Sequence, residues 1–209
     1  MTEDRRRTTL WLVLGVAILV ATHWLDRWGV ASLAIPSAND RDWGRLLRVM
    51  GFAPTWLVVS AILWLEARGQ SAESAAALRT TAVAIIAAVA LGGLGAEALK
   101  LLVRRERPDP TIATYVFRPF AVDPWSTRRL GFPSSHAAVA FAGASALAFR
   151  FRKAAPILLG LAVGCGLTRV FAGAHFLSDV AGAGVFGSAA GWWVAGRFER
   201  RRARLSFQP

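Results

Sequence analysis

Six long apolar runs, separated by polar connections, constrain the fold of this chain more than any other feature of its sequence. They cover approximately residues 10–25, 51–65, 80–103, 134–149, 155–168 and 176–195. A chain that crosses lipid must satisfy its backbone hydrogen bonds internally, and a helix does so within one segment. The sequence therefore predicts an all-α, polytopic membrane helix bundle with six transmembrane helices, formed as one membrane-embedded domain over residues 1–209.

The composition supports a membrane protein. Of the 209 residues, 55% are hydrophobic and 18% are charged, with a mean hydropathy of +0.41, whereas soluble domains carry about 25% charged residues. The net charge of +12 would suggest nucleic-acid binding in a soluble protein. Here the basic residues lie mostly between or beyond the apolar runs, so we interpret them as topology signals and anion ligands, and we expect no nucleic-acid partner.

The flanks of the apolar runs give further expectations. The first run follows Arg5, Arg6 and Arg7 but ends without a small-residue cleavage site, so it is expected to be a retained span. Residues 43–50 have the spacing of a short surface-lying helix, and residues 66–79 resemble a polar linker. Glycines four residues apart at 160 and 164, and at 187 and 191, predict close helix packing.

Six spans place both termini on one side of the membrane, and the basic flanks of the first run and the tail favour the cytoplasm. The charged residues near the span ends then fall together at the outer, periplasmic or extracellular face. Residues 104–133, the longest polar connection, lie at the same face, and a loop of that length is usually functional. Three separate sequence blocks therefore converge on one level of the bilayer.

The stretch from Arg169 to Asp179 places charge beside apolar runs, where an Arg or Asp costs about 2.5–3.5 kcal/mol at mid-bilayer. His175 and Asp179 are four residues apart, so on a helix they would share one face. A carboxylate beside a histidine favours a nucleophile or a base, and Arg169 offers a cation to an anionic substrate. The alternative is a structural ion pair joining two helices, which the convergence of three blocks disfavours.

Three motifs carry a family resemblance. They are Lys100 followed after six residues by Arg107-Pro108; Pro133-Ser134-Ser135-His136; and Arg169, five residues, His175, three residues, Asp179. In order and spacing they resemble the three signatures of the type 2 phosphatidic acid phosphatase family, in its membrane lipid phosphatase branch. The resemblance covers residues 100–179 directly. Ser135 stands where the family usually has Gly, and Thr168 where it usually has Ser.

The resemblance implies a phosphatase that works through a phosphohistidine. His175 would attack phosphorus, Asp179 would orient it, and His136 would protonate the leaving oxygen and then activate water. The implied phosphate-binding residues are Lys100, Arg107, Ser134, Ser135 and Arg169. No carboxylate cluster or Cys/His ligand spacing indicates a metal, so we expect neither a metal nor a cofactor.

The implied substrate is a membrane lipid phosphate: a polyprenyl diphosphate such as undecaprenyl diphosphate, phosphatidic acid or phosphatidylglycerol phosphate. Two alternatives remain at this point. One is a vanadate-dependent haloperoxidase, which shares the anion pocket, although those relatives are soluble. The other is a non-catalytic anion-binding or transport protein, which would not need the set of His136, His175 and Asp179. The sequence does not indicate an oligomeric state.

Overall fold

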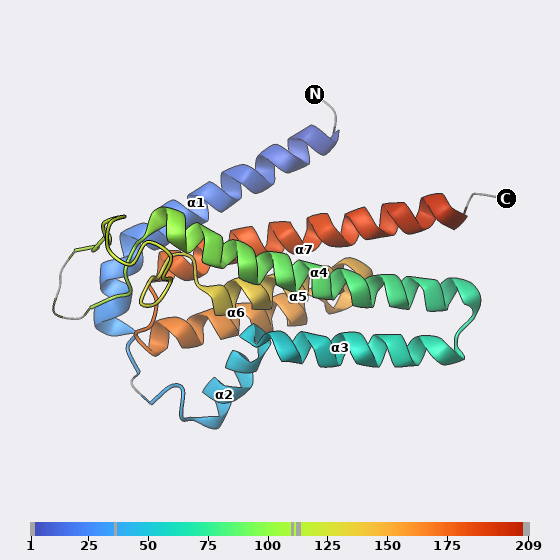
Figure 1. The fold of residues 1–209 in the computed structure, drawn as a ribbon, viewed down its shortest axis with the longest axis horizontal. Helices are drawn as coiled ribbons and strands as arrows, with labels where there is room; N and C mark the ends of the chain where they lie inside the picture. The colour runs from blue at the N-terminus through green and yellow to red at the C-terminus, as the bar shows by residue number, and fades with distance from the viewer. Residues whose placement is uncertain (1–2, 36, 110, 112–113, 207–209) are drawn as a thin grey trace.

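The computed structural model describes residues 3–35, 37–109, 111 and 114–206. This part of the chain is helical and contains no named strand, only two isolated bridges that pair Arg105 with Phe117 and Glu106 with Leu130. Figure 1 shows the arrangement of α1 (Glu3–Ser32), α2 (Asp42–Arg48), η1 (Val49–Gly51), α3 (Ala53–Glu66), η2 (Ala67–Gly69), α4 (Ala72–Val103), α5 (Ser135–Arg150), η3 (Arg152–Ala154), α6 (Ala155–Phe171) and α7 (Leu177–Ser206).

The six apolar runs coincide with α1, α3, α4, α5, α6 and α7, and the expected short helix coincides with α2 and η1. By length and composition, three described helical segments could cross a membrane: Thr9–Ser32, Ala72–Val103 and Arg152–Phe171. A fourth span is formed if the pair Asp42–Gly51 and Ala53–Gly69, bent by 71°, counts as one. The all-α membrane bundle is thus confirmed, while the number of six spans stays a prediction.

The prediction that residues 66–79 form a linker is wrong in its second half. The side chain of Ser71 accepts a hydrogen bond from the backbone N–H of Ser74 at 3.4 Å, which caps α4 and starts it at Ala72. The alanine-rich segment that follows favours a helix. The basic tail is helical and continues α7 as far as Ser206.

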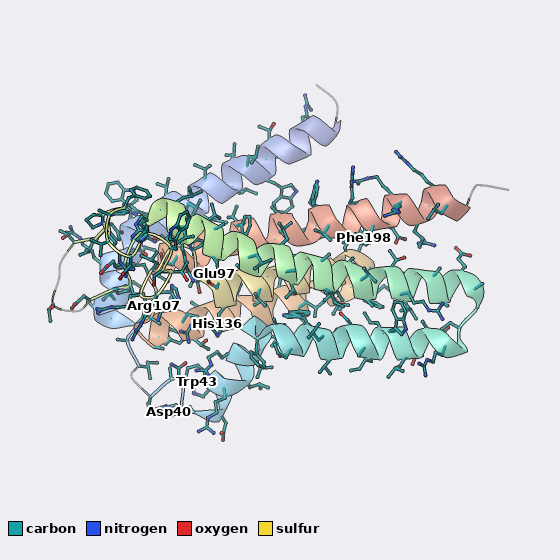
Figure 2. All side chains as sticks on the ribbon, viewed as in Figure 1. Asp40, Trp43, Glu97, Arg107, His136 and Phe198 are labelled. Carbon is teal, nitrogen blue, oxygen red and sulfur yellow. The ribbon has the colours of Figure 1, made fainter. Side chains whose placement is uncertain are left out.

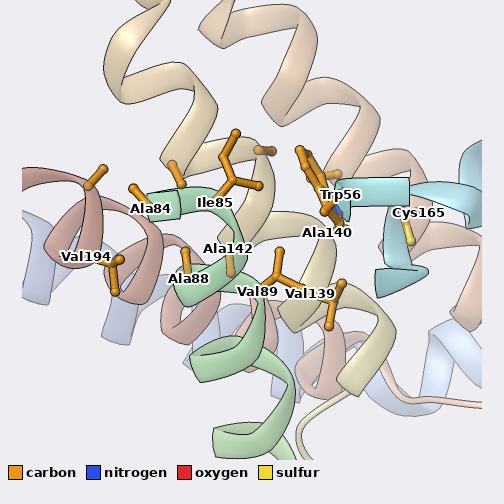
Figure 3. Packing of buried hydrophobic residues seen from close by; sticks show 14 residues of the cluster. Trp56, Ala84, Ile85, Ala88, Val89, Val139, Ala140, Ala142, Cys165 and Val194 are labelled. Atoms are coloured by element: carbon orange, nitrogen blue, oxygen red, sulfur yellow. The ribbon is translucent and has the colours of Figure 1, made fainter. Parts of the chain in front are cut away.

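Helix α5 lies at the centre of the bundle and packs against α4, α6 and α7. Its buried residues are mostly alanine and glycine, which lets large side chains of other helices approach it. Trp56 of α3 lies against Gly143, where an added Cβ would come within 2.3 Å of the indole ring. Figure 3 shows Trp56 with Ala140 and Ala142 of α5 in this core.

The close helix packing predicted for Gly187 and Gly191 is confirmed, and the helix that approaches them is α5. A Cβ at Gly187 or Gly191 would lie 2.5 Å from the backbone oxygen of Ala138 or Ala142, so the two helices touch through their backbones. For the other pair the prediction is only half right. Gly164 faces the side chain of Leu47, but Gly160 has nothing within 4 Å.

The ends of four helices meet at one end of the bundle. The connection between α4 and α5 lies there, with the start of α7 beside it, while the turn between α3 and α4 and the C-terminal end of α7 lie at the opposite end (Figure 1). The three sequence motifs occupy the end of α4 with the first residues of the connection after it, the start of α5, and the segment from the last turn of α6 to the first turn of α7. The fold therefore brings the motifs together.

We expect Gly191→Val to destabilise the protein by about 2–3 kcal/mol, because the new side chain would meet backbone atoms of α5 that cannot rotate away. Gly160→Val adds the same atoms to an open site on α6 and should change stability by less than about 0.5 kcal/mol. The thermal midpoints of the detergent-purified variants measure the difference. Equal midpoints for the two variants would refute the close contact of α5 and α7.

Candidate active site

The structure gathers the eight candidate residues at the end of the bundle that holds the long connection. Figure 2 shows Arg107 and His136 at this end, together with Glu97 and far from Phe198. Arg107 is exposed, yet its charge acts on both Arg169 and His175. The eight residues are Lys100 in the last turn of α4, Arg107 in the connection, Ser134, Ser135 and His136 at the start of α5, Arg169 in the last turn of α6, His175 before α7 and Asp179 in its first turn.

His175 and Asp179 meet, although not in the way their spacing predicts. His175 precedes α7, which begins at Leu177, so the expected shared helix face is wrong. The Asp179 carboxylate instead turns back toward the helix start, where its Oδ2 accepts the backbone N–H of Phe176 at 2.8 Å. This is the return half of a capping box. The same oxygen lies 3.4 Å from Nδ1 of His175, and both side chains are buried.

A buried arginine that the motifs do not single out holds the other oxygen of Asp179. Arg105 forms an ion pair with Oδ1 of Asp179 and donates to Oγ of Ser178 at 2.9 Å. Its guanidinium lies 4.9–5.2 Å from the ring centres of Tyr115, Phe132 and Phe176. Aromatic faces favour a cation in this position. Arg105 is therefore fixed by contacts on several sides.

A second buried carboxylate, Asp26 of α1, completes this cluster. Its Oδ2 lies 4.0 Å from Arg105 and accepts hydrogen bonds from Ser178 Oγ and, at 3.0 Å, from the Tyr115 hydroxyl. Its Oδ1 accepts the backbone N–H of Ser178 at 2.8 Å. Burial and the hydrogen bond from its hydroxyl to Asp26 raise the pKa of Tyr115 to about 12, so the phenol remains a donor. Asp26 thereby ties α1 to the first turn of α7.

The sequence offered only weak signals for Arg105 and Asp26. Arg105 stands inside the first motif, among other basic residues, and Asp26 directly follows the first apolar run. The structural roles of both residues depend on partners far along the chain; Asp26 and Ser178, for example, are 152 residues apart. Local spacing cannot reveal such a pair.

Lys100 is held in a triad with Glu97 and Ser135. Its Nζ lies 2.7 Å from a Glu97 oxygen and also donates to Ser135 Oγ, which in turn donates to Glu97. Lys100 is buried, whereas 40% of the Glu97 side chain is exposed. The hydroxyl of Ser135, which departs from the usual Gly of the family motif, thus contacts a phosphate-ligand candidate directly.

The site offers donors that suit an anion. Oγ of Ser134 and Nε of Arg169 are buried and have no hydrogen-bond partner among the described residues. Ser134 also precedes the first turn of α5, whose free N–H groups favour a negative charge. Its own N–H donates to the backbone oxygen of Asp179 at 3.1 Å, which fixes α5 against α7. In the described part of the chain, no group of three or more His, Cys, Asp or Glu is placed to hold a metal ion.

The structure thus places a cation-rich candidate site with a buried histidine–carboxylate pair at one end of a membrane helix bundle. The sequence model of the PAP2 superfamily matches residues 81–203. Because this match covers more than half of the 209 residues, the chain belongs to the PAP2 superfamily.

Among characterised proteins, the chain is similar to a lipid A 1-phosphatase of Rhizobium etli. The two are 27% identical over 166 residues, which cover 75% of this chain and 69% of the relative. No solved structure is significantly similar to the chain. The superfamily match includes all eight candidate site residues, but not Asp26.

We expect Arg105→Gln to destabilise the protein by about 3–5 kcal/mol, because it leaves the carboxylates of Asp26 and Asp179 buried without their cation. Adding Asp26→Asn to this variant removes one of the two charges and should restore part of the lost stability. Thermal unfolding in detergent measures both effects, with the exposed Arg128→Gln as the matched control. A stability of Arg105→Gln equal to that of the control would contradict the assigned ion pairs.

Proposed function

We propose that this protein is a membrane lipid phosphatase that hydrolyses a phosphomonoester or diphosphate headgroup through a phosphohistidine. The observation that carries the proposal is the contact of His175 with Asp179, 3.4 Å apart, beside the cations Arg107 and Arg169. A nucleophile oriented by a carboxylate and surrounded by fixed positive charge is the arrangement that phosphoryl transfer requires. Membership of the PAP2 superfamily supports the same chemistry.

His175 is the proposed nucleophile. Burial lowers the pKa of His175 below its usual value, although Asp179 acts in the opposite direction, and this favours the neutral form of the imidazole that a nucleophile needs. Nδ1 faces the carboxylate, which leaves Nε2 with the lone pair that attacks phosphorus. Asp179 then stabilises the positive charge that the imidazole gains as the new bond forms.

The cations and donors around His175 would bind the phosphoryl oxygens. Arg107 and Arg169 offer paired N–H donors, Lys100 offers a point charge, and Ser134 and Ser135 stand at the N-terminus of α5. Because side chains and N–H groups supply this charge stabilisation, the proposed reaction is independent of metal ions. Lys100 already contacts Glu97 and Ser135, so a bound phosphate would share it with them.

His136 is the proposed acid and base. It lies in the first turn of α5, where the charge of Arg169 acts on it. It would give a proton to the departing oxygen and later take one from the water that hydrolyses the phosphohistidine. An anion-binding or transport protein would need neither step, so this histidine pair favours the enzyme over the alternatives.

The proposed substrate is a lipid whose phosphate lies at the membrane surface. The Rhizobium etli relative is named for the 1-phosphate of lipid A, which adds that lipid to undecaprenyl diphosphate, phosphatidic acid and phosphatidylglycerol phosphate as candidates. We place the site at the outer face with both termini in the cytoplasm, since the basic tail of α7 lies at the opposite end of the bundle.

Phosphate release by the purified protein from a panel of these four lipids tests the function. We expect turnover of at least one lipid in the presence of excess chelator, and no turnover of any by His175→Ala, because no other residue of the site can replace the nucleophile. Arg68→Gln, which alters an exposed arginine in the turn between α3 and α4, at the opposite end of the bundle, is the control. Robust turnover by His175→Ala, or activity that a divalent ion must restore, would contradict the proposal.

The effect of His136→Ala should depend on the leaving group. A lipid alkoxide needs the proton of a general acid, which is worth about 10²–10⁴-fold, whereas a nitrophenolate leaves without one. We therefore expect a large loss of kcat/KM on a lipid monoester and a much smaller loss of kcat/KM on nitrophenyl phosphate, because kcat/KM covers only the steps up to departure of the leaving group and not the later hydrolysis of the phosphohistidine. Equal losses on the two substrates would exclude His136 as the acid.

A further inference from the structure

The connection between α4 and α5 carries an exposed apolar surface over residues 116–125, here called the aromatic loop. Phe117 is 58% exposed, Phe120 68% and Trp125 86%, with Val116 and Val122 exposed beside them. The loop lies at the same end of the bundle as the candidate active site. None of these side chains belongs to the proposed phosphate site, so that site does not explain why so much apolar surface is exposed here.

A single buried arginine, Arg104, holds the backbone of the aromatic loop in place. Arg104 is 1% exposed, and its guanidinium donates to the backbone oxygens of five loop residues and lies 5.2 Å from the ring centre of Phe120. Its own backbone oxygen accepts the N–H of Arg118 at 3.0 Å. The five acceptors are the carbonyls of Arg118, Pro119, Val122, Asp123 and Pro124.

The hydrogen bonds from Arg104 to the loop carbonyls suit a segment that moves from water into the membrane interface. Irregular loops that face lipid are excluded from the hydrocarbon region, because each unsatisfied carbonyl costs free energy away from water, and this cost begins as a loop leaves water at the interface. In the aromatic loop, Arg104 satisfies these carbonyls from within, while the apolar side chains point outward. Phenylalanine and tryptophan at the surface of such a loop match the interfacial layer of a bilayer, where aromatic side chains concentrate.

The surfaces on either side of the aromatic loop also suit contact with lipid. The last turns of α4 expose Leu94 and Leu102 to 73% and 69%, and Val103 directly precedes Arg104. Residues 104–115, which are mostly polar, separate this candidate span from the aromatic loop in the chain. The bridge between Arg105 and Phe117, and the hydrogen bond from the Arg118 N–H to the Arg104 oxygen, bring the loop back to the end of α4. On its other side the loop is followed by the exposed Arg128 and Arg129, which suit the phosphates of lipid headgroups.

We propose that the aromatic loop inserts Phe117, Phe120 and Trp125 into the interfacial layer of the leaflet at which the site opens. Its occupant is the lipid bilayer, and its effect is to hold the rim of the site at the level of lipid headgroups. The proposal rests on the membrane placement of the helices and not on the phosphatase chemistry.

Spin labels at single cysteines test the insertion in reconstituted vesicles of neutral and anionic phospholipid, in a Cys165→Ser background. Labels at Phe120→Cys and Trp125→Cys should be more accessible to oxygen than to a water-soluble nickel chelate. A label at Thr111→Cys, an exposed polar position of the same connection, should show the reverse. Preferential access of nickel at 120 and 125 would overturn the proposal, and so would exclusion of both reagents, which indicates a protein partner or a second copy.

A kinetic comparison provides the second readout. Phe120→Ser combined with Trp125→Ser should raise the apparent KM for a lipid phosphate in vesicles by about five- to tenfold, since apolar area buried in the bilayer is lost. Hydrolysis of water-soluble nitrophenyl phosphate by the same variant should match that of the parent. Equal losses on both substrates would mean that the loop shapes the phosphate site, which contradicts the proposal. The spin-label result stands even if neither substrate is turned over.

Discussion

The ion pairs of Arg105 with two fully buried carboxylates, Asp26 and Asp179, are the interactions on which the candidate site depends. Each carboxylate alone would be too costly to bury, and the single guanidinium serves both. Because Asp26 belongs to α1, Arg105 to the connection and Asp179 to α7, the same charges join three distant segments. The proposed nucleophile His175 takes its orientation from the carboxylate at the centre of this cluster.

The helix packing makes such a cluster possible. The glycines of α7 bring its backbone onto α5, so that Ser134 can donate its N–H to the backbone oxygen of Asp179. The proposed phosphate donors at the start of α5 and the histidine–carboxylate pair before and within α7 are thereby held in one geometry. Preorganised donors of this kind need no rearrangement when charge develops on a bound phosphoryl group.

Much of the fold and of the site could be predicted from the sequence, because their signals are local. Apolar runs mark the helices, and short motifs with fixed spacing mark residues such as Lys100, His136 and His175. The long-range partners could not be predicted: Arg105 resembles its basic neighbours, and Asp26 is a lone carboxylate until the fold places it beside Ser178. The shared helix face expected for His175 and Asp179 is wrong, because His175 precedes α7 and the Asp179 carboxylate turns back to cap the start of that helix.

The proposed phosphohistidine is the central claim, and trapping it is the most direct test. The purified protein would be mixed with labelled substrate, quenched within one turnover and digested at alkaline pH, where a phosphohistidine survives, for peptide mapping by mass spectrometry. The account predicts phosphate on His175, labile to acid and absent from His175→Ala. Phosphate on Ser134 or Ser135, or turnover with no phosphorylated enzyme at any time, would contradict it.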